Sequence, residues 1–144
     1  MKELGHIDCH VHMYPRNSSN LGSFRLYMSG MRDQERVRRA QENPKFFIQL
    51  LDEANVEKAF IISVVSPKVG GFPFKINDFV ADYCAKYPDR LIPFGSIDPR
   101  QTKNPRKELH YLLDELGVRG IKIHPCHQLV YPNEYRTTKL KSLG

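Results

Sequence analysis

The stretch Ala59-Phe-Ile-Ile-Ser-Val-Val65 is an apolar run that is rich in β-branched residues. Such a run is typical of a strand in a parallel sheet, because helices cover both faces of that kind of sheet. Strand-like segments are also expected before and after it along the chain, at residues 7–12, 91–97 and 120–124. Helical patterns separate the segments, with a repeat of roughly thirty residues, which is the length of a βαβ unit.

The alternation of strands and helices predicts the fold class. Strands that alternate with helices form parallel sheets with right-handed crossovers, so we expect an α/β fold built from parallel βα units. The pattern fails after Pro125, where we expect neither a further strand nor a convincing amphipathic helix.

Asparagine marks the predicted helix starts. Asn43-Pro44 and Asn104-Pro105 each place a capping side chain before a proline in the first helical turn. Asn77 is predicted to cap the helix between them. Asn55 and Gly117 are predicted to end two helices in the left-handed conformation.

Composition limits the class of protein. The chain has 144 residues, 40% of them hydrophobic, which suffices for the core of one domain or part of one. No stretch approaches the roughly 20 apolar residues that cross a bilayer, so no membrane partner is expected. The odd number and wide spacing of Cys9, Cys84 and Cys126 argue against disulfides and for a reducing, cytoplasmic location. We expect these three cysteines to be small buried side chains.

The net charge of +6 raises the question of a nucleic-acid partner. Much of the excess lies in a short charged helix expected over residues 32–41 and in the tail from Arg136 onward. The basic residues are not interleaved with aromatics, and no recognition motif accompanies them. The pattern therefore favours a solvated helix face and a basic tail over a nucleic-acid-binding surface.

Two histidines lie two positions apart on the first predicted strand. Because side chains alternate along a strand, His10 and His12 share one face with Asp8, while apolar side chains take the other. Imidazole nitrogen is a standard ligand for zinc and neighbouring metals, so the pair predicts a divalent metal site. The alternative is two partly exposed histidines at a strand end.

A second polar pair is expected at the same rim. Lys122 and His124 share a face of the fourth predicted strand, and active sites in parallel βα folds lie at the carboxyl ends of the strands. Lys122 needs a partner, because burying an unpaired ammonium is costly. It would neutralise a substrate carboxylate, pair with Asp8, or be carbamylated and bind metal.

Two further residues are candidates for contact with substrate or with the metal ligands. Asp98 ends the third predicted strand, where the alternative is an Asx turn before proline. Tyr14 follows the histidines and would cover the mouth of the site, where the alternative is simple loop packing.

These motifs resemble the amidohydrolase superfamily, and in particular its amidohydrolase-related branch. Ile7-Asp-x-His-x-His12, followed by Tyr14-Pro15, is similar to the opening of the superfamily, and Val118-Arg-Gly-Ile-Lys-Ile-His-Pro125 is similar to the fourth-strand signature of the branch. The resemblance covers residues 4–135 and extends to three further segments: 51–60, 87–91 and 95–99. The branch includes decarboxylases of the aminocarboxymuconate-semialdehyde and resorcylate types, along with hydrolases, hydratases and lactonases.

The resemblance implies a fold and a metal. The family fold is an eight-stranded TIM-type (β/α)8 barrel, so residues 1–135 would form its N-terminal half and residues 136–144 a divergent polar tail. By family pattern His10 and His12 would bind a catalytic divalent metal, usually zinc. The other ligands would come from strands that this sequence does not contain, so no catalytic residue is assigned.

The resemblance also implies a function with alternatives. The leading hypothesis is a metal-dependent hydrolase or decarboxylase that acts on a small carboxylated or cyclic substrate. The alternatives are an inactive fragment or one subunit of a split enzyme, and a small basic nucleic-acid-binding protein is the least favoured. A half barrel has unpaired edge strands, so we expect a homodimer or a complementary C-terminal half as partner.

Overall fold

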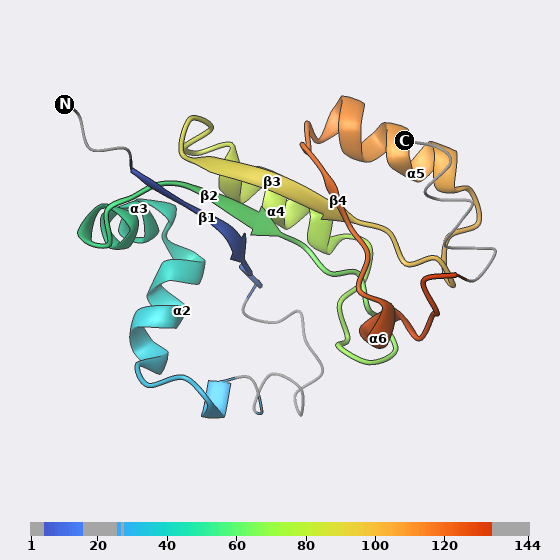
Figure 1. Cartoon of the computed structure of the whole chain (residues 1–144), viewed down its shortest axis with the longest axis horizontal. Coiled ribbons are helices and arrows are strands. Elements are labelled where there is room, and N and C mark those ends of the chain that lie inside the picture. Colours follow the sequence, from blue (N-terminus) through green and yellow to red (C-terminus); the bar gives the residue numbers. More distant parts are fainter. Residues whose placement is uncertain (1–4, 16–25, 27, 134–144) are drawn as a thin grey trace.

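The computed structural model describes residues 5–15, 26 and 28–133. It contains a sheet of four parallel strands in the order β1-β2-β3-β4. The strands lie side by side, with the carboxyl end of each toward the same rim (Figure 1). Their bounds are β1 His6–Val11, β2 Val56–Ile62, β3 Leu91–Ser96 and β4 Ile121–Lys122. The predicted α/β fold with four parallel βα strands is therefore confirmed.

Helices follow each of the first three strands, as predicted. Their bounds are α2 Gln34–Glu42, α3 Pro44–Glu53, α4 Ile76–Cys84, α5 Pro105–His110 and α6 Pro125–Gln128, and a π-helical turn, η1 Tyr111–Glu115, continues α5. The side chains of Asn43 and Asn104 accept hydrogen bonds from the third residue after each, which confirms both predicted caps. Asn55 and Gly117 have positive φ angles of 53° and 64°, so both predicted left-handed stops are also confirmed.

The prediction for Asn77 is wrong. The N-cap of α4 is Lys75, and Asn77 lies inside the helix and is fully buried. Its Oδ1 accepts hydrogen bonds from Ser63 Oγ at 2.6 Å and from Ser96 N at 2.8 Å, and its Nδ2 donates to the carbonyl oxygens of Phe74 and Ser96. Tertiary contacts with two strands therefore outweigh the local capping preference of asparagine.

The second and fourth strands differ in extent from the sequence prediction. The apolar run 59–65 correctly predicts buried residues. The strand β2 nevertheless begins earlier, at Val56, because Val56 pairs with His6 of β1. The fourth strand was expected over residues 120–124 and is two residues long, paired only with Gly95 and Ser96 of β3. The apolar pattern indicates which residues are buried, whereas the length of a strand depends on the strand with which it pairs.

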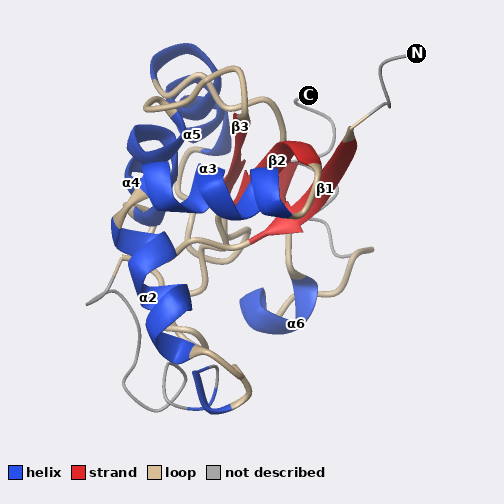
Figure 2. Cartoon of the chain, turned by 90° about the vertical axis from the view of Figure 1, so that its left-hand side faces the viewer, coloured by secondary structure: helices blue, strands red, loops and turns tan. Residues whose placement is uncertain are grey.

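One face of the sheet carries the core. Helices α3, α4 and α5 lie on one side of the strands (Figure 2). Buried side chains of β2 and β3, namely Ala59, Ile61 and Leu91, pack there in one cluster with Phe47 of α3 and Val80 of α4. On the opposite face the rings of Phe60 and Phe94 stack at 5.0 Å and remain half-buried.

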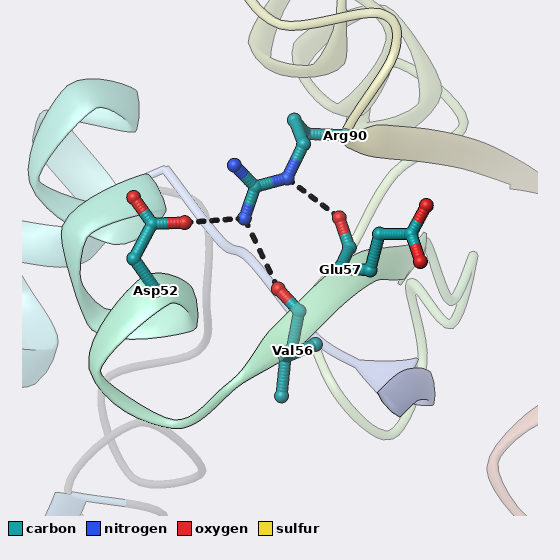
Figure 3. A network of polar contacts seen from close by, with 4 residues as sticks. All are labelled: Asp52, Val56, Glu57 and Arg90. Carbon is teal, nitrogen blue, oxygen red and sulfur yellow. Dashed lines mark hydrogen bonds and ion pairs between the residues drawn. The ribbon is translucent and has the colours of Figure 1, made fainter. Parts of the chain in front are cut away.

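Arg90 ties the amino-terminal ends of β2 and β3 to the end of α3. Its Nε donates to the carbonyl oxygen of Glu57 at 2.5 Å, and its Nη2 donates to that of Val56 at 3.0 Å (Figure 3). The same Nη2 forms an ion pair with Asp52 at 2.6 Å. This contact fixes the end of the sheet opposite to the histidines.

The carboxyl end of the sheet is closed by α6, a single helical turn that the sequence analysis did not predict. Its Gln128 is buried, and Gln128 Nε2 donates to the carbonyl oxygens of Val65 and Ile97. Gln128 Oε1 accepts from the backbone N–H of His124 at 2.9 Å. One amide thus joins the segments that follow β2, β3 and β4.

The prediction that all three cysteines are buried is confirmed for Cys84 and wrong for Cys9 and Cys126. All three thiols are free, but only Cys84 is buried, and burial raises its pKa to about 12. Cys9 and Cys126 are exposed.

None of the helices in the described part of the chain is long and apolar enough to cross a membrane. The predicted tail over residues 136–144 lies outside the described residues.

Candidate metal centre

The end of β1 contains a bulge that prepares the histidine pair. Asp8 pairs with Ala59 and Val11 with Ile61, so β1 uses one more residue than β2 over this interval. The carboxylate of Asp8 accepts a hydrogen bond from the backbone N–H of His10 at 3.0 Å. Bulges of this kind change the direction of the side chains that follow them.

The rings of His10 and His12 converge. Their Nε2 atoms lie 3.1 Å apart, and the ring planes are inclined by 69°. On the other side of the His12 ring, Nδ1 lies 2.8 Å from the carbonyl oxygen of Ile62. Because a carbonyl oxygen only accepts, Nδ1 carries the hydrogen, which leaves the lone pair of neutral His12 on Nε2.

This arrangement fits a shared cation. Histidine ligands in metal sites commonly donate their second ring nitrogen to a carbonyl oxygen, as His12 does to Ile62. Two nitrogens bound at about 2.1 Å to one metal lie roughly 3.0 to 3.4 Å apart for common coordination angles. The observed separation of 3.1 Å falls within that interval. His10 and His12 are therefore suited to act as two ligands of one divalent metal.

The structure brings the β4 pair to the same place. Burial is the largest influence on His12 and lowers its pKa, and the charges of His10, Lys122 and His124 lower it further. The pKa of His124 is lowered first by burial, then by His127 and Lys122, and His10 also contributes. The charges of Lys122 in β4 and of His124 just after it thus act on His12 at the end of β1.

Aromatic rings continue the site on the side of Tyr14. The Tyr14 ring lies parallel to that of His12, with centroids 5.7 Å apart, and parallel to that of Phe72 at 4.4 Å. Tyr14 is 9% exposed, so it belongs to the packed wall of the site. This geometry agrees with loop packing, the alternative that the sequence left open, and it also fixes the plane of the His12 ring.

His124 lies near the opposite edge of the sheet and, like His12, has an aromatic ring stacked on its own. Its ring stacks on that of His127 with centroids 4.0 Å apart. Its Nδ1 is buried and has no hydrogen-bond partner among the described residues. Two stacked imidazoles so close to Lys122 favour the neutral form of His124, in agreement with its lowered pKa.

Lys122 and Asp98 differ in their relation to this cluster. Lys122 forms no ion pair among the residues that the structure describes, so the suggested pairing with Asp8 is not present there. Asp98 is buried, and its carboxylate accepts from the backbone N–H of Arg100 at 2.9 Å. That is the Asx turn, and burial raises the pKa of this carboxyl. No described contact joins Asp98 to the histidines.

The described residues contain no group of three or more His, Cys, Asp or Glu side chains placed to hold a metal. These residues supply two metal ligands, with the positive charge of Lys122 near them. Sequence reasoning missed three contributors: the carbonyl oxygen of Ile62, the ring of Phe72 and the stacked ring of His127. The first has no signal in the side-chain pattern. Phe72 lies in the segment between β2 and α4 and His127 in α6, and only the fold determines where these two segments lie.

Comparison with known proteins places this geometry in a family. The sequence model of the family described as Amidohydrolase matches residues 7–141. Gamma-resorcylate decarboxylase of Rhodococcus jostii is 30% identical over an alignment of length 90 that covers 56% of this chain and 27% of the relative.

Solved structures share the fold. The 5-carboxyvanillate decarboxylase of Novosphingobium aromaticivorans, with bound manganese, matches 98% of this chain at a TM-score of 0.71 and 23% identity. A 2,6-dihydroxybenzoate decarboxylase in complex with 2,6-dihydroxybenzoate matches 96% of this chain at a TM-score of 0.63 and 18% identity. The chain spans 48% and 46% of the lengths of these two proteins, about half in each case. The four strands thus correspond to a half barrel, and the chain belongs to the amidohydrolase family.

Proposed function

We propose that this chain carries the first part of the active site of a divalent-metal-dependent decarboxylase that acts on a small carboxylated aromatic compound. The observation that carries the proposal is the convergence of His10 and His12 Nε2 at 3.1 Å, with His12 fixed by Ile62. The similar proteins, which are decarboxylases of resorcylate, dihydroxybenzoate and carboxyvanillate, support the reaction class.

Each residue of the proposed site has a separate role that follows from its position. His10 and His12 would hold the metal. When bound, such a cation supplies Lewis-acid stabilisation of negative charge on a substrate oxygen. Lys122 carries a positive charge at the same rim, without an ion-pair partner among the described residues, and is placed to attract a carboxylate. Tyr14 and Phe72 hold the His12 ring in its plane.

The identity of the metal is part of the proposal. The family resemblance implies zinc, and solved structures of similar proteins contain manganese. The pair of nitrogens accommodates either ion, because the bond lengths differ by only about 0.1 to 0.2 Å. The proposal is therefore a divalent cation, with zinc and manganese as the two candidates to compare. Decarboxylation is favoured over hydrolysis, the other reaction expected from the sequence, because these similar proteins are all decarboxylases.

Metal analysis tests the site directly. The purified chain is dialysed against zinc or manganese, and its metal content is measured by mass spectrometry beside the double variant His10→Ala/His12→Ala. The control is His110→Ala, since His110 is exposed on α5 and pairs only with Asp114 at 2.9 Å. We expect near-stoichiometric metal in wild type and in the control, and a loss of at least tenfold in the double variant. Equal metal content in all three would refute the site.

Catalysis is proposed for the complete barrel and not for this chain alone. Two histidines are fewer ligands than the three protein ligands typical of catalytic zinc. We propose that four further βα units complete the barrel, supplied by a complementary C-terminal half or by a second copy of this chain. The free thiols of Cys9 and Cys126 support a reducing, cytoplasmic setting for it.

A further inference from the structure

A second feature beside His12 is a pocket of about 310 Å³ between the end of β1 and helix α2. Its volume lies at the lower end of the range for ligand sites, about 300 to 1,000 Å³, so it suits a molecule of one ring. The lining is mostly apolar and includes Met13, Val37, Ala40, Phe47 and Leu50. His12 lines the pocket as well, which makes it continuous with the histidine pair.

Gln41 is the exception in this apolar wall. Val37, Ala40 and Gln41 lie at helical spacing on the face of α2 that packs on the core, a position where an apolar side chain is expected. Gln41 is nonetheless 6% exposed, and its Nε2 is buried without a hydrogen-bond partner among the described residues. Unpaired buried donors are rare in native structures, because such a donor has lost its hydrogen bonds to water and forms none within the protein.

The charges around the pocket do not select a ligand by themselves. Arg32 and Asp33 both line it and carry opposite charges. Arg36 is held by Glu53 in an ion pair of 2.6 Å, and Asp33 accepts from the backbone N–H of Arg36 as the cap of α2. Arg32 is exposed to solvent, so among the described residues of the wall the buried polar group without a partner is the amide of Gln41.

We propose that this pocket is the substrate-ring subsite and that Gln41 Nε2 donates a hydrogen bond to an acceptor oxygen on a single-ring aromatic ligand. The inference rests on the proposed function, because it places the ring against His12 and hence beside the metal pair. Gln41 is a specificity-determining residue in this account: it rejects rings that lack an acceptor, since they would leave its donor unpaired.

The test compares two leucine variants on the same helix. Gln41→Leu removes the donor and keeps the approximate volume, and Gln34→Leu changes an exposed glutamine at the start of α2. Binding of 2,6-dihydroxybenzoate to the 144-residue chain is measured by calorimetry, with and without manganese. We expect the dissociation constant to rise at least fivefold for Gln41→Leu and to change less than twofold for Gln34→Leu.

A spectroscopic measurement keeps the test decisive if Gln41→Leu does not fold. The side-chain amide of Gln41 in wild type is observed by ¹H–¹⁵N correlation during the same titration, with the amide of Gln34 as internal control. We expect the Gln41 amide to shift on ligand addition and the Gln34 amide to stay. No binding to wild type, or binding that shifts neither amide, would overturn the inference.

The outcomes also separate this inference from the proposed function. Metal bound at His10 and His12 together with unchanged ligand affinity in Gln41→Leu would defeat the subsite alone. Ligand binding that depends on Gln41 in a chain that holds no metal would defeat the metal proposal and leave the pocket in place.

Discussion

At the scale of single residues, the side chains that matter most are polar groups in unusual positions. The pair His10 and His12 could be found from the sequence, because alternation along a strand fixes which residues share a face. Asn77, Gln41 and Gln128 could not, since each is a polar residue whose burial depends on elements far away in the chain. A sequence pattern assigns such residues to caps or surfaces by default.

Asn77 provides the first prediction. Replacement by alanine removes the acceptor of the buried Ser96 N–H and the donor to the Ser96 and Phe74 carbonyl oxygens, while the Ser63 hydroxyl keeps the Phe94 carbonyl oxygen at 3.1 Å. We expect Asn77→Ala to lower the free energy of unfolding by roughly 3 kcal/mol, since each buried unpaired group costs about 1 to 3 kcal/mol. Urea denaturation followed by circular dichroism measures the loss. Asn133→Ala, at an exposed asparagine, serves as control and should change stability by less than about 0.5 kcal/mol. A similar small effect for both variants would show that Asn77 does not hold the strands.

At the scale of elements, the sequence predicted the order and type of strands and helices but not their ends. The caps at Asn43 and Asn104 depend only on neighbouring residues in the chain, so the sequence pattern predicts them correctly. The extent of β2 and β4 is set by their partners, and α6 is held by the tertiary contacts of Gln128, so neither has a local signal. The position of β4 matters most for function, because it carries Lys122 to the rim.

Gly120 controls the position of β4. A Cβ at this residue would overlap the ring of Phe94 on β3, which itself stacks on Phe60. We expect Gly120→Ala to destabilise the chain by about 1 to 3 kcal/mol, as overpacking in a core does. It should also shift the imidazole resonances of His124 in NMR spectra.

The double variant Gly120→Ala/Phe94→Leu is the matched control for this prediction. Removing the ring gives the new methyl group space, so the additional cost of Gly120→Ala in the Phe94→Leu background should fall to less than half. Equal costs in both backgrounds would mean that Phe94 is not what the methyl group meets.

At the scale of the whole molecule, the described part of the sheet has two open edges, and helices α3, α4 and α5 cover one of its faces. The β1 and β4 edges have no further strand among the described residues, and the rings of Phe60 and Phe94 are half-buried on the open face. Unpaired edges and apolar faces promote association. The family resemblance predicted this half barrel from its end motifs, whereas what covers the open face depends on a partner that the pattern of one chain does not encode.

The 144-residue chain, purified by itself, is therefore expected to self-associate. Sedimentation velocity between about 5 and 100 μM should show dimers or larger species whose fraction rises with concentration, because the driving force is burial of the open face. A monomer that stays monodisperse over this range and melts cooperatively would contradict the expectation.

His10 and His12 at the end of β1 are expected to hold a divalent cation at the rim of the sheet that also carries Lys122 and His124. Paramagnetic broadening by Mn²⁺ tests it most directly, because the broadening falls steeply with distance from the ion. In imidazole ¹H–¹⁵N spectra we expect the signals of His10 and His12 to vanish first, those of His124 to follow, and those of His110 to persist. Broadening of all histidines alike, or of His110 before His12, would contradict the account.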